Sequence, residues 1–184
     1  MKPDVYFSVD IEASGPIPAK FSMLALGACL VTDVEKNFYV ELQPISNDFV
    51  PKALEVSGFD LAALKESGRA PAEAMRQFGR WVQETADGGH PVFVGFNGCF
   101  DWQFVNWYFE SFTGANPFGF GGVDIKSFYM GLTGKPWSAT SSRQLPPEFQ
   151  PDSRQTHNAL DDAKAQASIY NKMLVAARKS VSKS

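Results

Sequence analysis

The stretch from Phe7 to Gly15, FSVDIEASG, places two carboxylates in an apolar β-type run. Asp10 and Glu12 are two residues apart, and side chains alternate between the faces of a strand, so both carboxylates belong to the same face. Burying like charges together is unfavourable, and carboxyl groups without a partner bind protons instead. The pair therefore indicates a cation site, or else a strand that ends before Glu12 and leaves only Asp10 partly buried.

The segments around this stretch predict an α/β domain with a mixed five-stranded sheet flanked by helices. We expect strands at residues 5–11, 22–32, 38–42, 91–95 and 123–125, with a turn at 33–37 and the first three strands forming an antiparallel meander. We expect helices at 61–66, 71–86, 101–112 (buried nearly all round) and about 159–178, plus a short helix after the fifth strand. No linker divides the chain, so residues 1–184 are expected to form one domain, with a basic tail at 178–184.

Composition excludes several classes of protein. Of 184 residues, 44% are hydrophobic and 20% charged, which is typical of a globular chain and not of a disordered one. The longest apolar run, Met23 to Val31, is too short to span a membrane, and we expect no export because nothing in the first ten residues points to it. Cys29 and Cys99 lack metal or disulfide spacing, so we expect buried free thiols and a cytoplasmic location.

The net charge of −3 argues against a protein that coats nucleic acid, because such binding needs a broad basic surface. It does not exclude an enzyme that holds a few nucleotides through metal ions. The 16 Phe, 5 Tyr and 4 Trp residues are numerous, and core packing accounts for most of them. The surplus could form stacking platforms for bases.

Two further acidic motifs open predicted helices. Asn97-Gly-Cys-Phe-Asp101 follows the fourth strand, where Asp101 is either a helix N-cap or a ligand at the edge of the sheet. The last helix opens with His157-Asn-Ala-Leu-Asp161-Asp162. The positive end of the helix dipole stabilises the two acids, and His157 is a candidate base. Either motif alone is as readily structural as functional.

Taken together, the motifs predict a metal site. Asp10, Glu12, Asp101, Asp162 and His157 all fall at a strand end or a helix start, which one edge of a sheet can gather. Hard oxygen ligands in that number suit Mg²⁺ or Mn²⁺. Two such ions about 3.5–4 Å apart clamp a phosphodiester during in-line displacement. A zinc site is disfavoured because no cysteine belongs to the set.

The ordered set resembles the DEDDh class of 3′-to-5′ exonucleases, from Asp10 to Asp162. The resemblance implies a ribonuclease H-like fold and two divalent ions, Mg²⁺ or Mn²⁺, held by four carboxylates. Asp10 would bridge both ions, with Glu12, Asp101 and Asp162 completing their shells. His157 would take a proton from the water that attacks the terminal phosphodiester, and 5′-mononucleotides would be released.

The same resemblance suggests substrate-binding residues. In relatives, the segment after the first motif holds substrate, and a His often stands just before the second-motif Asn, where this chain has Phe96. Basic residues before His157 are candidates for phosphate binding, although a solvated loop explains each equally well. The candidates are Phe21, Ser22, Met23, Phe96, Asn97 (which orients the second motif or a ligand water) and Arg143, with Lys135 and Arg154 as further basic residues.

We therefore expect a metal-dependent exonuclease acting on the 3′ ends of single-stranded DNA or RNA. The alternatives are a phosphodiesterase restricted to very short oligonucleotides, which the modest basic content fits, and a non-catalytic binding module on the same fold. A homodimer is a further expectation, because some relatives dimerise.

Overall fold

A five-stranded mixed sheet forms the centre of the computed structural model, which describes residues 2–152 and 156–181, with the backbone alone for 180 and 181. The strand order is β3-β2-β1-β4-β5. The first three strands pair antiparallel, and β1, β4 and β5 pair parallel, which confirms the predicted mixed sheet. The strands are β1 (Asp4–Ala13), β2 (Met23–Leu30), β3 (Asp33–Glu41), β4 (His90–Gly95) and β5 (Gly122–Asp124).

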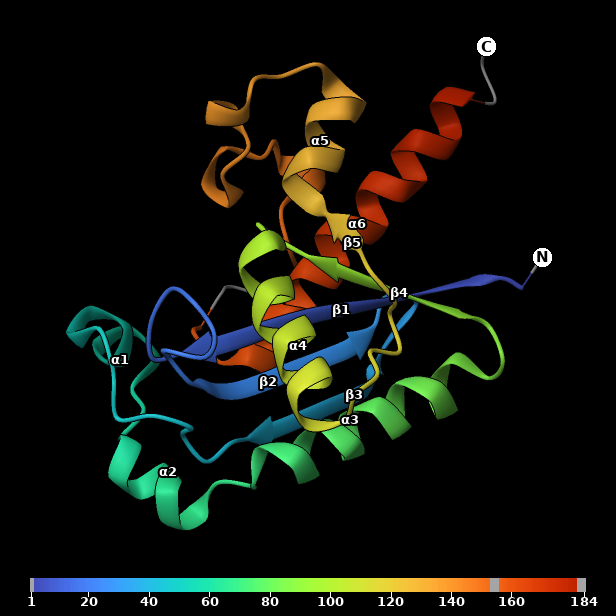
Figure 1. Cartoon of the computed structure of the whole chain (residues 1–184). Helices are drawn as coiled ribbons and strands as arrows, with labels where there is room; N and C mark the ends of the chain where they lie inside the picture. The colour runs from blue at the N-terminus through green and yellow to red at the C-terminus, as the bar shows by residue number, and fades with distance from the viewer. Residues whose placement is uncertain (1, 153–155, 182–184) are drawn as a thin grey trace.

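Helices cover both faces of the sheet (Figure 1). On one face, α3 (Pro71–Ala86) and α4 (Cys99–Phe112) bury an aromatic core that includes Phe78 and Phe104. On the other face lie α6 (Ala159–Val181) and α5 (Ile125–Thr133), around a second core that includes Tyr170. The short helices α1 (Pro51–Ser57) and α2 (Leu61–Ser67) lie at the end of the sheet where β1 finishes.

The alternation of β1 decides which face carries the carboxylates. Phe7, Val9 and Ile11 belong to the core under α3 and α4. The intervening residues, among them Asp10 and Glu12, therefore belong to the α6 face. Both fall inside β1, so the alternative in which the strand ends before Glu12 is wrong.

Two predicted features of the first half were wrong. The turn expected at 33–37 lies instead at Val31 and Thr32, and β3 already begins at Asp33, where a register shift between Cys29 and Leu30 interrupts the ladder. Helix α1 was not predicted, because no side chain of this fully described helix is buried and its sequence therefore has no apolar period.

The second half shows further differences. Helix α4 begins at Cys99 with Gly98 as its N-cap, so Asp101 lies in the first turn and is not the cap. The Cys99 thiol is exposed, contrary to prediction, whereas Cys29 is buried. Buried positions recur on one side of α4 only, so the helix is not buried all round. Three short 3-10 helices follow α5, none of which was predicted: η1 (Trp137–Ala139), η2 (Ser142–Gln144) and η3 (Pro147–Phe149).

Two of the helices begin at residues that suit a helix start. The Asp60 carboxylate caps α2 by accepting hydrogen bonds from the N–H groups of Ala62 (2.7 Å) and Ala63 (3.1 Å). Pro71 occupies the first turn of α3. Among the described residues, no helix combines the length and apolar character needed to cross a bilayer.

Candidate active site

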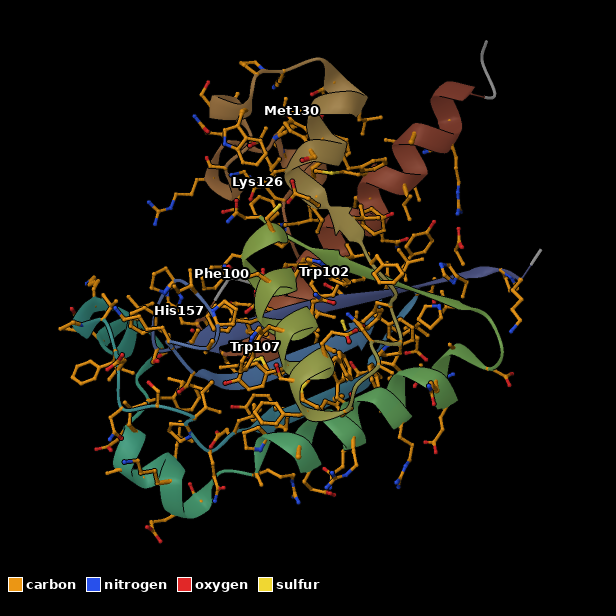
Figure 2. The ribbon with its side chains drawn as sticks, viewed as in Figure 1. Phe100, Trp102, Trp107, Lys126, Met130 and His157 are labelled. Carbon is orange, nitrogen blue, oxygen red and sulfur yellow. The ribbon has the colours of Figure 1, made fainter. Side chains whose placement is uncertain are left out.

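The structure brings all five predicted residues into one open pocket of about 220 Å³. The pocket lies where β1, the β4–α4 connection and the start of α6 meet. Its lining comprises Asp10, Glu12, Asp101, Asp162 and His157, together with Ile11, Phe96, Asn97 and Phe100. Figure 2 shows His157 and Phe100 among the side chains at this end of the sheet.

Asp10 is positioned by a side chain that the sequence analysis did not assign to the site. The amide nitrogen of Gln166, on α6, donates a hydrogen bond to Asp10 Oδ1. The amide oxygen of Gln166 accepts a hydrogen bond of 2.9 Å from the backbone N–H of Phe96. Gln166 is 1% exposed. One buried amide therefore joins a carboxylate on β1 to the loop that follows β4.

Asp101 belongs to α4, which covers the face of the sheet opposite to α6, and its carboxylate lines the pocket. Its Oδ1 accepts a hydrogen bond of 3.1 Å from the backbone N–H of Ile11, the residue between the two carboxylates of β1. This contact fixes the first turn of α4 against the strand. The Asp101 side chain is buried, and burial raises its pKa to about 8, although the hydrogen bond from Ile11 opposes the shift.

Asp162 holds the turn that presents His157. Its two carboxylate oxygens accept hydrogen bonds from the backbone N–H groups of Thr156 (2.8 Å) and His157 (3.2 Å). His157 has a φ of 59°, a left-handed conformation that a non-glycine residue adopts at some cost. Its imidazole is exposed, whereas Asp162 is 5% exposed. The carboxylate thus shapes the backbone that carries the candidate base.

The pocket is electrostatically unfavourable without a cation. Burial raises the pKa of Glu12 to about 7, and the neighbouring charge of Asp162 adds to the shift. Burial also raises the pKa of Asp10 well above its usual range, with further contributions from Asp101, Asp162 and Glu12. The pKa of Asp162 is raised by burial as well. Four carboxyl groups with raised pKa values in one pocket are what a resident divalent cation would offset.

The donor atoms are close enough together for a metal ion. One ligand atom from each of Glu12, His157 and Asp162 lies within 4.8 Å of the other two. Asp10 and Asp101 line the same pocket but stand outside this group. Carboxylate oxygens predominate, so the donor set fits a hard divalent ion such as Mg²⁺ or Mn²⁺. The geometry also offers His157 as a ligand, a role that the sequence analysis did not consider.

The predicted substrate residues separate into two groups. Phe96 and Asn97 line the pocket. Ser22 and Met23 are fully buried. The Ser22 hydroxyl accepts hydrogen bonds from the N–H groups of Ile45 (3.0 Å) and Ser46 (3.2 Å), so it supports a loop and is not open to a ligand.

The remaining candidates lie outside the pocket. Phe21 is 9% exposed, and its ring packs on Gly15, where a Cβ would lie 2.4 Å from it. Arg143 is exposed in η2, and Lys135 is exposed at 5.7 Å from the ring centroid of Tyr129. Arg154 lies outside the described residues. Met23 could have been excluded as a substrate-binding residue from the sequence, because it lies in an unbroken apolar run.

Two residues at or beside the pocket were not assigned to the site from the sequence, for different reasons. Gln166 left a signal, because it is a polar residue on the otherwise apolar face of α6 that also carries Ala163, Tyr170 and Met173. Phe100 left none, since an aromatic residue before Asp101 is equally consistent with core packing. Its ring lies 5.5 Å from that of Phe104 and lines the pocket as well.

A ribonuclease H-like sheet with this ordered set of carboxylates and one histidine at its edge defines a nuclease of the DEDDh class. No family model matches the chain. It is 44% identical over 168 residues to the Escherichia coli protein "3'-5' DNA exonuclease Cap18", covering 91% of this chain and 90% of that one. The chain belongs to the DEDDh family of 3′-5′ exonucleases.

Solved structures agree on the fold. The nuclease domain of 3'hExo, a DEDDh family member bound to rAMP, superposes with a TM-score of 0.74 at 16% identity, covering 94% of this chain and 92% of that domain. E. coli Exonuclease I in complex with a dT13 oligonucleotide gives a TM-score of 0.64 at 14% identity, covering 96% of this chain and 42% of that one. At these identities the likeness establishes the ribonuclease H-like fold alone.

Proposed function

We propose that this exonuclease removes 5′-mononucleotides from the 3′ end of single-stranded DNA, with two divalent ions, Mg²⁺ or Mn²⁺, held by Asp10, Glu12, Asp101 and Asp162. The observation that carries the proposal is the convergence of four carboxylates with raised pKa values in one pocket. DNA is favoured over RNA because the relative that shares 44% identity is named a DNA exonuclease.

Each residue has a task that follows from its position. Bound divalent ions would stabilise negative charge on the phosphate and on the leaving 3′ oxygen. The His157 imidazole, which lines the pocket and is exposed to solvent, takes the proton from the attacking water. Asp162 keeps that histidine at the mouth of the pocket, and Asn97 and Phe96 face the terminal nucleotide.

The test is cleavage of 5′-labelled single-stranded DNA and RNA with Mg²⁺, Mn²⁺ or EDTA. We expect a ladder that shortens from the 3′ end in either metal, faster on DNA, and no cleavage in EDTA. Asp10→Ala should abolish the ladder while the protein stays folded, because the change removes charge repulsion. Asp161→Ala is the matched control, since Asp161 is exposed and not among the pocket residues. Substantial cleavage by Asp10→Ala would refute the metal assignment.

The alternatives predict other results. A phosphodiesterase restricted to short oligonucleotides would cleave dinucleotides and leave longer strands intact. A binding module would retain strands without shortening them. The family membership favours the exonuclease, and the complete set of five site residues favours an active one.

Three further expectations belong to this proposal. We keep one exonuclease domain over residues 1–184 and a cytoplasmic location, which the two free thiols, Cys29 and Cys99, support. We also keep a homodimer, which size-exclusion chromatography with light scattering tests directly.

A further inference from the structure

Trp137, in η1, is a large aromatic residue whose backbone is held by hydrogen bonds and which remains open to solvent. Its side chain is 49% exposed. Its backbone carbonyl accepts two hydrogen bonds from Thr140, one from the N–H (3.1 Å) and one from the hydroxyl (2.7 Å). Thr140 is fully buried, so this turn is fixed in the protein. An indole on a fixed turn has only two side-chain torsions to lose when a flat partner stacks on it.

A lysine links this indole to the pocket. The ammonium of Lys126, in the first turn of α5, lies 3.9 Å from the centroid of the Trp137 ring. It also lies 3.4 Å from Oδ1 of Asn97, which lines the pocket. In the part of the chain that the structure describes, Lys126 takes part in none of the four ion pairs. In Figure 2, Lys126 lies on the side of Phe100 that faces α5, and His157 lies on the opposite side of Phe100.

The position of Lys126 relative to the carboxylates is fixed by Asp124. One oxygen of Asp124 accepts a hydrogen bond of 2.9 Å from the N–H of Gly98, the N-cap of α4. The other accepts one of 2.9 Å from the N–H of Ser127 in α5. A single carboxylate therefore ties the helix that carries Asp101 to the helix that carries Lys126.

Charge explains why this arrangement suits a nucleic-acid strand. A polyanion that leaves the acidic pocket needs a cation outside it, and the chain as a whole has a net charge of −3. An ammonium 3.4 Å from a pocket residue supplies that cation, and the adjacent indole supplies a face on which any unpaired base can stack.

We propose that Lys126 and Trp137 form a subsite for the nucleotide next to the one in the pocket. The ammonium binds its phosphate, and the indole stacks on its base. The inference rests on the proposed function and specifies its substrate as a strand at least two nucleotides long. Because the penultimate base can stack on the indole only after it leaves its neighbours in a duplex, the subsite favours single-stranded ends over blunt duplex ends.

The test compares two substrates that differ only in their use of the subsite. The p-nitrophenyl ester of thymidine 5′-monophosphate has a leaving group that carries neither the base nor the phosphate of a second nucleotide, whereas oligo-dT of about ten nucleotides carries both. We expect Trp137→Ala and Lys126→Ala to lower kcat/KM on oligo-dT about tenfold, mainly through KM, and to lower it much less on the ester. Trp137→Phe should retain most activity on oligo-dT because it keeps a stacking face.

Phe120→Ala is the matched control, since Phe120 is the most exposed aromatic side chain of the described residues, at 101%, and does not line the pocket. It should leave both substrates unaffected. Equal losses on the ester and on oligo-dT, or no loss on either, would overturn the subsite.

A binding measurement separates this inference from the proposed function. The anisotropy of fluorescein-labelled oligo-dT is titrated in EDTA, so that no cleavage is required. We expect Trp137→Ala to weaken binding about tenfold relative to wild type and to Phe120→Ala. Weakened binding by a protein that cleaves neither substrate would refute the proposed function and retain the subsite. Unchanged binding would refute the subsite whatever the activity.

Discussion

Gly27 lies directly opposite Asp10 in the β1–β2 ladder, and a Cβ on Gly27 would stand 2.2 Å from the backbone carbonyl carbon of Ala159. The first residues of α6 therefore rest on the sheet itself. This contact, possible only for glycine, brings the segment with His157 and Asp162 beside the strand that carries Asp10.

Gly27→Ala should damage the site without touching any residue of the pocket lining. The added methyl group would push the start of α6 from the sheet, and overpacking of this kind costs about 1–3 kcal/mol. We expect a lower melting temperature. We also expect a lower kcat at an assay temperature at which the variant is still folded. Thermal melts and kcat/KM on oligo-dT measure both.

The control for this change is Gly131→Ala, because a Cβ there has no described neighbour within 4 Å. Gly131 lies inside α5, where alanine is the better helix former. If Gly27→Ala melts and turns over like Gly131→Ala, the close approach does not position α6.

Gln166→Leu should reduce turnover and metal affinity together. It leaves the N–H of Phe96 without its acceptor and Asp10 without its donor, and an unpaired buried polar group costs about 1–3 kcal/mol. Gln166→Glu keeps an acceptor for Phe96 but places a second carboxylate against Asp10, so it should be at least as inactive. Mn²⁺ affinity by calorimetry and kcat are the readouts.

Asn171→Leu, an exposed position on the same helix, is the matched control for Gln166→Leu. If Mn²⁺ affinity is the same in Gln166→Leu, Asn171→Leu and wild type, the amide supports only the packing of α6.

The metal-free protein should lose stability as the pH rises. The folded pKa values of Glu12 (about 7, from 4.5) and Asp101 (about 8, from 3.8) lie above those of the unfolded chain. Their contribution is therefore fully present below about pH 4 and is lost as the pH rises through about 8. We expect the melting temperature in EDTA to fall across this window.

Mg²⁺ should reverse the effect, raising the melting temperature more at pH 8 than at pH 5, because metal binding requires the charged carboxylates. Asp101→Asn should flatten the pH dependence in EDTA. A melting temperature that rises with pH between 5 and 8 in EDTA would contradict the assigned pKa directions.

His157→Ala distinguishes the two roles that the geometry allows. As a general base, His157 should contribute about 10²–10⁴-fold to the rate, with little effect on metal affinity. As a ligand with Glu12 and Asp162, it should also contribute to Mn²⁺ binding. We expect the rate loss and an unchanged Mn²⁺ titration. An unchanged rate and pH profile would make the histidine structural.

The mixed sheet and the convergence of the five motif residues could be predicted because most of the evidence for them lies in short stretches of sequence. Asp10 and Glu12 are unfavourable in an apolar strand whatever the rest of the chain does, and strand ends and helix starts meet at one edge in this topology. Phe21, Ser22 and Met23 were not predictable in the same way. Their burial depends on loops that pack from elsewhere, as the hydrogen bond from Ile45 to Ser22 shows.

The contact between Asp10 and Gln166 joins residues 156 positions apart in the sequence. Proteins are synthesised from the N-terminus, so a growing chain carries Asp10, Glu12 and Asp101 long before His157 and Gln166 exist. A nascent nuclease of this design can hold three of its carboxylates and still be unable to cut. Under the proposed mechanism, hydrolysis would therefore become possible only after α6 has docked on the sheet.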